Sequence, residues 1–174
     1  MKTTITAEQL AETLKLHRLW LDHDPNGQRA DLTGTDLQHA DLTYVNLEGA
    51  NLKNADLRNA DLTGARLVKA DLRWANLQKA KLRWANLRAA NLRNANLTQT
   101  KAHDASFRLA DLTLADATRA DMRDATFDEA NLNEAEFSRA DLGHADFGDT
   151  ELRGAKLANA HLRRANLTRT DARL

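Results

Sequence analysis

A five-residue period runs from Ala30 to Leu174 and constrains the fold more than any other feature of the sequence. An apolar residue returns every five positions from Leu32 to Ala172, and these 29 centres comprise 21 Leu, 4 Phe, 1 Met and 3 Ala. Ala stands two positions before the centre in 24 of these repeats, and the residue between is mostly Asp or Asn. The unit is therefore A-(D/N)-L-x-x, and a repeat this short sets the fold of the whole region.

This period excludes an α-helix and a flat strand. Five residues turn a helix by about 500°, which scatters the Leu side chains around its axis. Five is also odd, so successive Leu residues on a flat strand point to opposite faces. If the chain turns a corner once per repeat, every Leu points to a common axis, and the coils stack about 4.8 Å apart. Asp and Asn suit such corners because their side chains hydrogen-bond to the backbone of tight turns.

The tandem units, such as ADLRNADLTGA at 55–65 and ANLRAANLRNANL at 85–97, resemble the pentapeptide repeat family over residues 30–174. The resemblance implies an all-β solenoid, a right-handed quadrilateral β-helix with four repeats per coil. The chain then forms about seven coils and a rod about 34 Å long. We expect residues 1–29 to form a separate N-terminal capping helix and turn.

The N-terminal segment has the pattern of a capped helix. Thr6-Ala7-Glu8-Gln9 matches a capping box, and Ile5 and Leu10 are placed for a hydrophobic staple. The apolar stripe predicts a helix over residues 6–22, ended by the turn at 24–27. We expect this helix to cover the open end of the first coil, with His17 packed and hydrogen-bonded.

Large and small centres alternate in a way that fits four sides per coil. Phe107, Phe127 and Phe147 are twenty residues apart and are predicted to stack as a ladder. Ala102 and Ala117 stand close to them in the repeat, as expected for an interior of fixed volume. With Leu72 and Leu87, the three Phe residues are predicted to be structural core.

Charge is banded along the chain although its formal sum is zero. Counting Lys and Arg against Asp and Glu gives −4 for residues 31–65, +8 for 66–101, −8 for 102–150 and +4 for 151–174. In a stack of coils these become bands along the rod. They are either drift in a solvated surface or a pattern that matches a partner or a second copy.

Two surfaces are candidate binding sites. The outward aromatic residues of the repeats are Tyr44, Trp74 and Trp84, and the basic residues near Trp84 are Lys81, Arg83 and Lys101. Aromatic and basic groups together bind acidic proteins or nucleic acid, although Trp can also simply cover Arg stems. The acidic candidates, which could imitate phosphates locally, are Asp124, Asp128, Glu129, Asp146 and Asp149.

We predict no catalysis, cofactor or metal site. The sequence has no nucleophile elbow, P-loop, dinucleotide glycine fingerprint or zinc-ligand spacing. Asp and His recur at twenty-residue intervals in two columns, Asp104–Asp124–His144 and Asp121–Asp141–His161. Such groups can bind metals, but the repeat places Asp in the second column in any case.

The predicted function is a non-catalytic protein-interaction scaffold, a rigid rod that presents banded charge to a macromolecular partner. The resemblance implies an alternative, because some pentapeptide repeat proteins mimic DNA, bind DNA gyrase or topoisomerase IV and protect them from inhibitors. The zero net charge and the +8 band depart from that pattern, since cations repel a phosphate-binding surface. Direct nucleic-acid binding through the basic band is a second, less favoured alternative.

Composition and the last repeat give two further expectations. The chain has no Cys, no run of 18 apolar residues and no secretion-type leader, so we expect a cytoplasmic protein without a membrane segment. Residues 151–174 end as a bare repeat, which predicts an end-to-end homodimer through the C-terminal coil.

Overall fold

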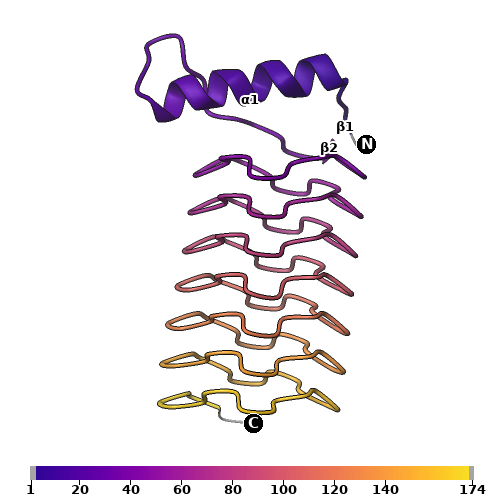
Figure 1. The fold of residues 1–174 in the computed structure, drawn as a ribbon, viewed down its shortest axis with the longest axis vertical. Helices are drawn as coiled ribbons and strands as arrows, with labels where there is room; N and C mark the ends of the chain where they lie inside the picture. Colours follow the sequence, from indigo (N-terminus) through magenta and orange to yellow (C-terminus); the bar gives the residue numbers. More distant parts are fainter. Residues whose placement is uncertain (1–2, 173–174) are drawn as a thin grey trace.

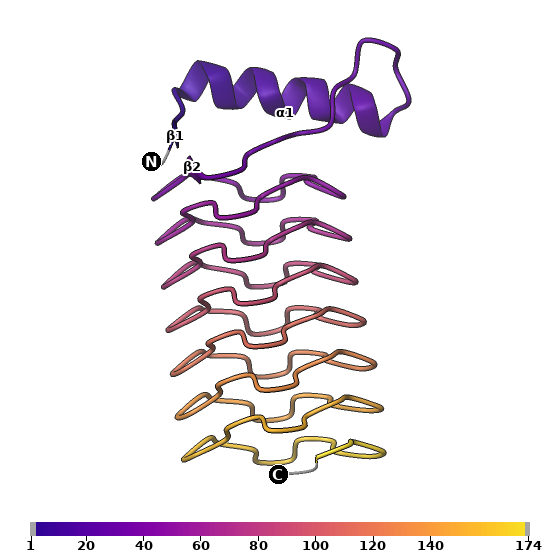
Figure 2. The ribbon, with the colours of Figure 1, turned by 180° about the vertical axis from the view of Figure 1, so that it is seen from behind.

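The computed structural model of the chain describes residues 3–172, and most of them form a stack of coils under one helix (Figure 1). Parallel β-bridges join the residue before each centre to the residue twenty positions further on, from Asp31–Asn51 to Glu151–Asp171. Each coil therefore contains four repeats. The view from behind shows the same regular stacking, with helix α1 (Ala7–Leu21) lying across the first coil (Figure 2).

Centres that are twenty residues apart lie on one face of the rod, because the bridges join successive coils at this interval. We name the four faces after their first centres: the Leu32, Leu37, Leu42 and Leu47 faces. The Leu32 and Leu42 faces are half a coil apart and therefore opposite, as are the Leu37 and Leu47 faces. In each repeat we call the residue before the centre the Asx position and the second residue after it the corner position.

A left-handed residue makes each corner. Every corner residue from 34 to 169 has a positive φ, between 54° and 67°. The centre carbonyl accepts a hydrogen bond from the N–H three residues later, as between Leu72 and Ala75 at 3.0 Å. These features are those of a turn whose third residue is left-handed, as in type II turns. No corner residue from 34 to 169 is Val, Ile or Thr, because β-branched side chains strain this conformation.

The repeat satisfies the hydrogen-bonding needs of its own backbone. Around Leu72, the N–H groups of Asp71, Leu72 and Trp74 donate to carbonyls of adjacent coils at 3.0, 2.7 and 3.0 Å. The N–H of Arg73 donates instead to Oδ1 of Asp71, at 3.2 Å. Every Asp and Asn at an Asx position from Asp31 to Asn166 accepts the corresponding bond. The recurring Asp and Asn are thus backbone acceptors, as buried N–H groups require.

The interior is filled by the centres and the Ala residues. Leu72 and Leu87 are fully buried, as predicted. Phe107, Phe127 and Phe147 form the expected ladder, with ring centroids 5.0 and 4.9 Å apart and planes within 6°. Phe137 adds an edge-on contact to Phe127 at 6.0 Å, which the sequence did not predict. Aromatic stacking and edge contacts of this kind add to the stabilisation from burial.

The N-terminal helix is present, and it begins with the capping box that the sequence predicts. The Thr6 N–H donates to Oε1 of Gln9 at 2.9 Å, and the Gln9 N–H donates to Oγ1 of Thr6 at 3.2 Å, which is a complete capping box. Leu10 and Leu14 pack against the core of the coils. His17 is fully buried and its Nδ1 accepts a hydrogen bond from the N–H of Ala30 at 3.1 Å.

A short strand before the helix extends the ladder, which the sequence did not predict. Strand β1 (Thr3–Thr4) pairs in parallel with strand β2 (Thr35–Asp36) of the first coil. The segment therefore occupies edge positions of the Leu37 face that the stack leaves unpaired, while α1 covers the apolar interior beside it.

Protonation of His17 should loosen the contact between α1 and the first coil. Burial, reinforced by the positive charge of Arg29, lowers the pKa of His17 below its ordinary 6.5. The unfolded chain thus binds the proton more readily, so the stability contributed by neutral His17 is present above pH 6.5 and is lost as the pH falls toward the folded pKa. We expect amide hydrogen exchange in α1, corrected for intrinsic rates, to accelerate between pH 7 and pH 5 relative to the coils.

The variant His17→Gln provides the control for this prediction, because it keeps a polar side chain at this position but does not titrate there. In this variant the amide exchange rate of α1, corrected for intrinsic rates, should not depend on pH. Equal pH dependence in the two proteins contradicts the assignment to His17.

Candidate interaction surfaces

The Leu42 face carries most of the predicted basic and aromatic residues. Tyr44 and Trp84 occupy its corner column, and their side chains are 71% and 49% exposed. The guanidinium carbon of Arg83 lies 3.8 Å from the centroid of the Trp84 ring, which is a cation–π contact. Lys81 and Lys101 lie on the same face in successive coils. The structure thus brings together five of the six residues in this predicted patch.

Gly64 allows Tyr44 to lie along this column. It is the corner residue between Tyr44 and Trp84, with φ of +66°, and a Cβ atom there would lie 2.5 Å from the Tyr44 ring. The ring therefore covers a position where other corners carry a side chain. The sequence showed the aromatic residues but did not show the role of this glycine.

Trp74 lies apart from this surface. It is a corner residue of the Leu32 face, half a coil from Trp84, and 48% of its side chain is exposed. Nζ of Lys53 lies 5.0 Å from its ring centroid and the guanidinium carbon of Arg73 lies 5.8 Å away. Trp74 thus belongs to a separate aromatic and basic site, on the opposite side of the rod.

A hollow of about 300 Å³ lies on the Leu42 face below Trp84 and is lined by Thr63, Lys81, Arg83, Lys101, His103, Asp121 and Arg123. Nζ of Lys81 is 2.8 Å from Asp61, and this hydrogen bond raises the pKa of Lys81. Arg123 donates two bonds of 2.7 Å to Asp121 and so lowers the pKa of that carboxyl. Among residues 3–172, Arg83 and Lys101 make no ion pair, so they are the cations of this hollow that remain available.

Lys81 and Lys101 occupy Asx positions, where the repeat normally places Asp or Asn. A lysine side chain carries no acceptor, so it cannot receive the N–H of the next residue. Each replacement thus gives up a hydrogen bond worth about 1 kcal/mol. The basic surface therefore lowers the stability of the rod, and a loss of stability in exchange for function is typical of binding sites.

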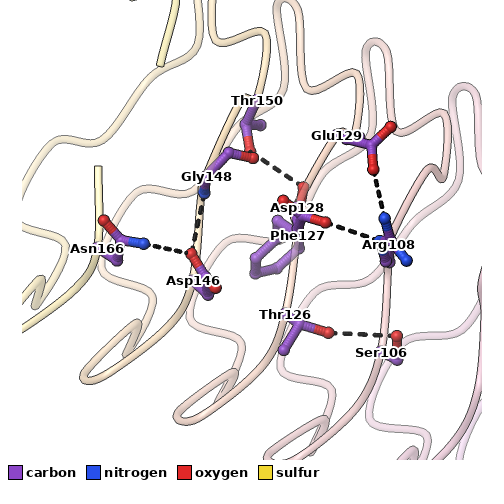
Figure 3. A network of polar contacts seen from close by, with 10 residues as sticks. All are labelled: Ser106, Arg108, Thr126, Phe127, Asp128, Glu129, Asp146, Gly148, Thr150 and Asn166. Atoms are coloured by element: carbon purple, nitrogen blue, oxygen red, sulfur yellow. Dashed lines mark hydrogen bonds and ion pairs between the residues drawn. The ribbon is translucent and has the colours of Figure 1, made fainter. Parts of the chain in front are cut away.

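The predicted acidic residues gather on the Leu47 face and its edge with the Leu42 face. Figure 3 shows three of them, Asp128, Glu129 and Asp146. Arg108 contacts both Asp128, at 2.7 Å, and Glu129, at 2.5 Å. Oδ1 of Asp146 accepts bonds from the N–H of Gly148 at 3.0 Å and from Nδ2 of Asn166 at 2.8 Å. Asp149 lies 3.6 Å from Arg169, whereas Asp124 is exposed at the shared edge. The patch exists, but two arginines neutralise part of its charge.

The two Asp and His columns are not arranged as a metal site in the part of the chain that the structure describes. His103 Nδ1 lies 2.9 Å from Asp104, and Asp121 is held by Arg123 as described above. Over the same residues, no helix has the length and apolar character needed to span a bilayer.

Comparison with known proteins agrees with this architecture. A sequence model of pentapeptide repeats matches in eight copies, over residues 28–59, 55–94, 90–128, 105–149 and 145–173. The chain belongs to the pentapeptide repeat family. Solved members of the family are right-handed quadrilateral β-helices, and the four-repeat coil of this chain is the same arrangement. No curated protein matches the sequence.

Two solved pentapeptide structures are similar to the chain. A trypsin-treated form of QnrB1, a plasmid-mediated fluoroquinolone resistance protein, has a TM-score of 0.65 and 21% identity, covering 81% of this chain and 72% of its own. HetL, involved in heterocyst differentiation regulation in the cyanobacterium Nostoc, is 30% identical with a TM-score of 0.41, covering 84% of this chain and 80% of its own. At 21% identity the similarity to QnrB1 concerns the fold alone.

Restoring an acceptor at residue 101 should stabilise the rod. Lys101→Asn supplies an oxygen for the N–H of His103, so we expect the free energy of unfolding to rise by about 1 kcal/mol in urea denaturation. Lys101→Met is the matched control, because it removes the charge without supplying an acceptor. If the two variants change stability equally, the cost of Lys101 is electrostatic and the missing hydrogen bond is not its cause.

Proposed function

We propose that this chain is a non-catalytic protein-interaction scaffold, which binds a protein partner through the basic and aromatic surface of the Leu42 face. The alignment of Tyr44, Gly64 and Trp84 in one corner column carries the proposal. Two large aromatic side chains, 71% and 49% exposed, lie in line on a rigid ladder of backbone hydrogen bonds. Trp, Tyr and Arg are the residues that dominate the energy of protein interfaces.

The electrostatics of this surface indicate an acidic partner. Arg83 and Lys101 lack carboxylate partners among the described residues, and both line the hollow below Trp84. A rigid surface loses little conformational entropy on binding, so the available cations and aromatics are pre-organised for a complementary face. The hollow fits an acidic side chain of the partner, with its neighbouring apolar groups against Trp84.

A site-specific photo-cross-linker tests this surface. We expect p-benzoylphenylalanine at Trp84 to capture a defined protein in cells that express the chain, and the same group at Gln99, a corner of the Leu37 face, to capture none. Against the purified partner, Trp84→Ala and Arg83→Ala should each weaken binding about tenfold or more. Trp74→Ala is the control, because it removes an exposed Trp from the opposite face.

Two results contradict this proposal. One is capture of the same proteins in the same amounts from Trp84 and Gln99. The other is an unchanged affinity for the captured partner after Trp84→Ala. Binding of labelled DNA that Arg83→Ala abolishes at low salt would instead support the nucleic-acid alternative.

A second candidate function is DNA mimicry toward a type II topoisomerase, favoured by the gathering of acidic residues on the Leu47 face. The QnrB1 fold similarity and the family's known gyrase-binding members supply the enzyme to be tested. The exposed carboxylates of this patch are Asp124, Glu129 and Asp149. The cations Arg66, Lys69 and Arg88 on the same face confine any phosphate-like stretch to a short part of the rod.

Gyrase supercoiling with and without a fluoroquinolone tests this candidate. We expect the wild-type chain to restore supercoiling in the presence of the drug, and Glu129→Gln/Asp149→Asn to lose this protection. Glu12→Gln/Glu134→Gln is the matched control, because it removes two exposed carboxylates outside the Leu47 face. If the wild type neither binds gyrase nor protects it, the DNA-mimic candidate is wrong and the scaffold proposal stands on its own test.

A further inference from the structure

The charges of the Leu47 face alternate in large blocks along the rod. From the first coil to the last, its outward charged residues are Glu48; Arg66 and Lys69; Arg88; Arg108; Asp128 and Glu129; Asp146 and Asp149; and Arg169. The basic block therefore lies on one side of the middle coil and the acidic block lies on the other. If a second copy of this face is turned end for end, its acidic block lies opposite the basic block of the first copy.

Contacts within the chain do not cancel this pattern. Arg66 is paired with Glu48 at 2.6 Å, and Arg108 is shared by two carboxylates. Lys69 and Arg88 are exposed and make no ion pair among residues 3–172, so the basic block keeps an excess of positive charge. Asp146 also has no cationic partner in that range, and Asp149 has only a 3.6 Å contact to Arg169. The acidic block thus keeps an excess of negative charge.

We propose that two copies of this chain associate side by side and antiparallel through their Leu47 faces. The occupant of this face is therefore a second copy, related by a two-fold axis that lies between the two faces, at the level of Arg108 in the middle coil. Such an interface is isologous, so each favourable contact occurs twice. This proposal goes beyond the scaffold function, which uses the Leu42 face.

The register of the coils places opposite charges against each other in this arrangement. A two-fold axis that lies in the interface plane, parallel to the strands, reverses the rod direction and lays each column of one copy over the same column of the other. Lys69, a corner residue, then lies opposite Asp149 of the second copy, and Arg66, an Asx residue, lies opposite Asp146. Arg88 lies opposite the Asp128 region. All these pairs follow from one position of the axis, because their members stand at equal heights on either side of it.

The middle of the face, where like groups meet at the axis, is weakly charged or apolar. Leu109 is a corner residue of the middle coil, and 38% of its side chain is exposed. It lies opposite Leu109 of the second copy. Ala89 is also a corner residue, one coil before Leu109, and it lies opposite Glu129, which is paired with Arg108 of its own chain. Arg108 is the one cation close to the axis, and its own Asp128 and Glu129 neutralise it.

The size of the face predicts a weak, salt-sensitive dimer. The face is about 34 Å long and about 10 Å wide, which gives about 340 Å² per copy. A stable interface buries about 800 Å² per partner. Association should therefore depend on the charges, with a dissociation constant on the order of 0.1 mM at low salt. The dimer also covers the acidic patch, so self-association competes with any partner that binds there.

Sedimentation velocity at increasing protein concentration tests the proposal. We expect a monomer–dimer equilibrium at about 20 mM ionic strength that is lost by about 0.5 M, because salt screens exposed charges. Lys69→Glu/Arg88→Glu should weaken dimerisation at least tenfold. Lys79→Glu/Arg119→Glu is the matched control: it makes the same charge change at two exposed cations of the opposite Leu37 face, and should alter the constant less than twofold.

A mixing experiment tests whether the Leu47 faces pair through their charges, and a chemical cross-link tests the antiparallel orientation. Lys69→Glu/Arg88→Glu makes both halves of the face acidic, and Glu129→Lys/Asp149→Lys makes both halves more basic, so each variant alone should be monomeric. Mixed in equal amounts they should form a heterodimer. Circular dichroism melting confirms that each variant is folded. Carbodiimide should also join Lys69 to Asp149 between wild-type copies, a link excluded within one chain because the residues are four coils, about 19 Å, apart.

Three outcomes overturn the proposal: a monomer at every salt and protein concentration, a dimer that the Leu47-face variants weaken no more than the control, and variants that fail to associate when mixed. A salt-resistant dimer that none of these substitutions affects would instead support end-to-end pairing through the C-terminal coil. None of these outcomes bears on the Trp84 cross-linking test of the scaffold.

Discussion

The hydrogen bond that the Asp or Asn side chain at an Asx position accepts from the N–H two residues later is the contact on which the other features depend. It holds the turn in which the corner residue is left-handed, and the turn directs the next centre into the interior. Ladder bonds of 2.6–3.3 Å then join each coil to its neighbours. Because the ladder, the turn and the side chain at the Asx position together satisfy the five N–H groups of a repeat that has Asp or Asn there, the rod needs no covering layer on its sides, and its outward side chains are free to vary.

This independence of surface from scaffold explains how the chain can carry several different surfaces. A corner side chain points away from the core, so Tyr44, Trp84 or Glu129 changes the surface chemistry with little effect on packing. A lysine at an Asx position lowers the stability of the rod more, because Lys81 and Lys101 supply no acceptor for the N–H two residues later. The sites where charge replaces an acceptor are therefore the places where the scaffold gives up stability for its surface.

The surfaces are also related to one another by the geometry of the coil. The Leu42 face carries aromatic groups and available cations. The Leu47 face carries a basic block before the middle coil and an acidic block after it. The two faces share an edge at Asp124, so a partner on one face and a second copy on the other approach each other there. Because the rod is rigid, binding at one surface affects binding at the other only through the closeness of the two bound molecules, and neither surface has to rearrange.

The sequence alone determined the period, the inward Leu and Ala, the Phe ladder and an N-terminal helix, predicted over residues 6–22 and found at Ala7–Leu21, because each depends on contacts within a repeat, within the helix or between adjacent coils. It also placed the charge bands along the axis. Only the tertiary structure showed that Gly64 makes room for Tyr44, that Arg108 neutralises Asp128 and Glu129, that Phe137 meets Phe127 edge-on, and that β1 pairs with β2. These features depend on side-chain direction or on chain docking between segments that the repeat does not relate, and the five-residue pattern contains no information about either.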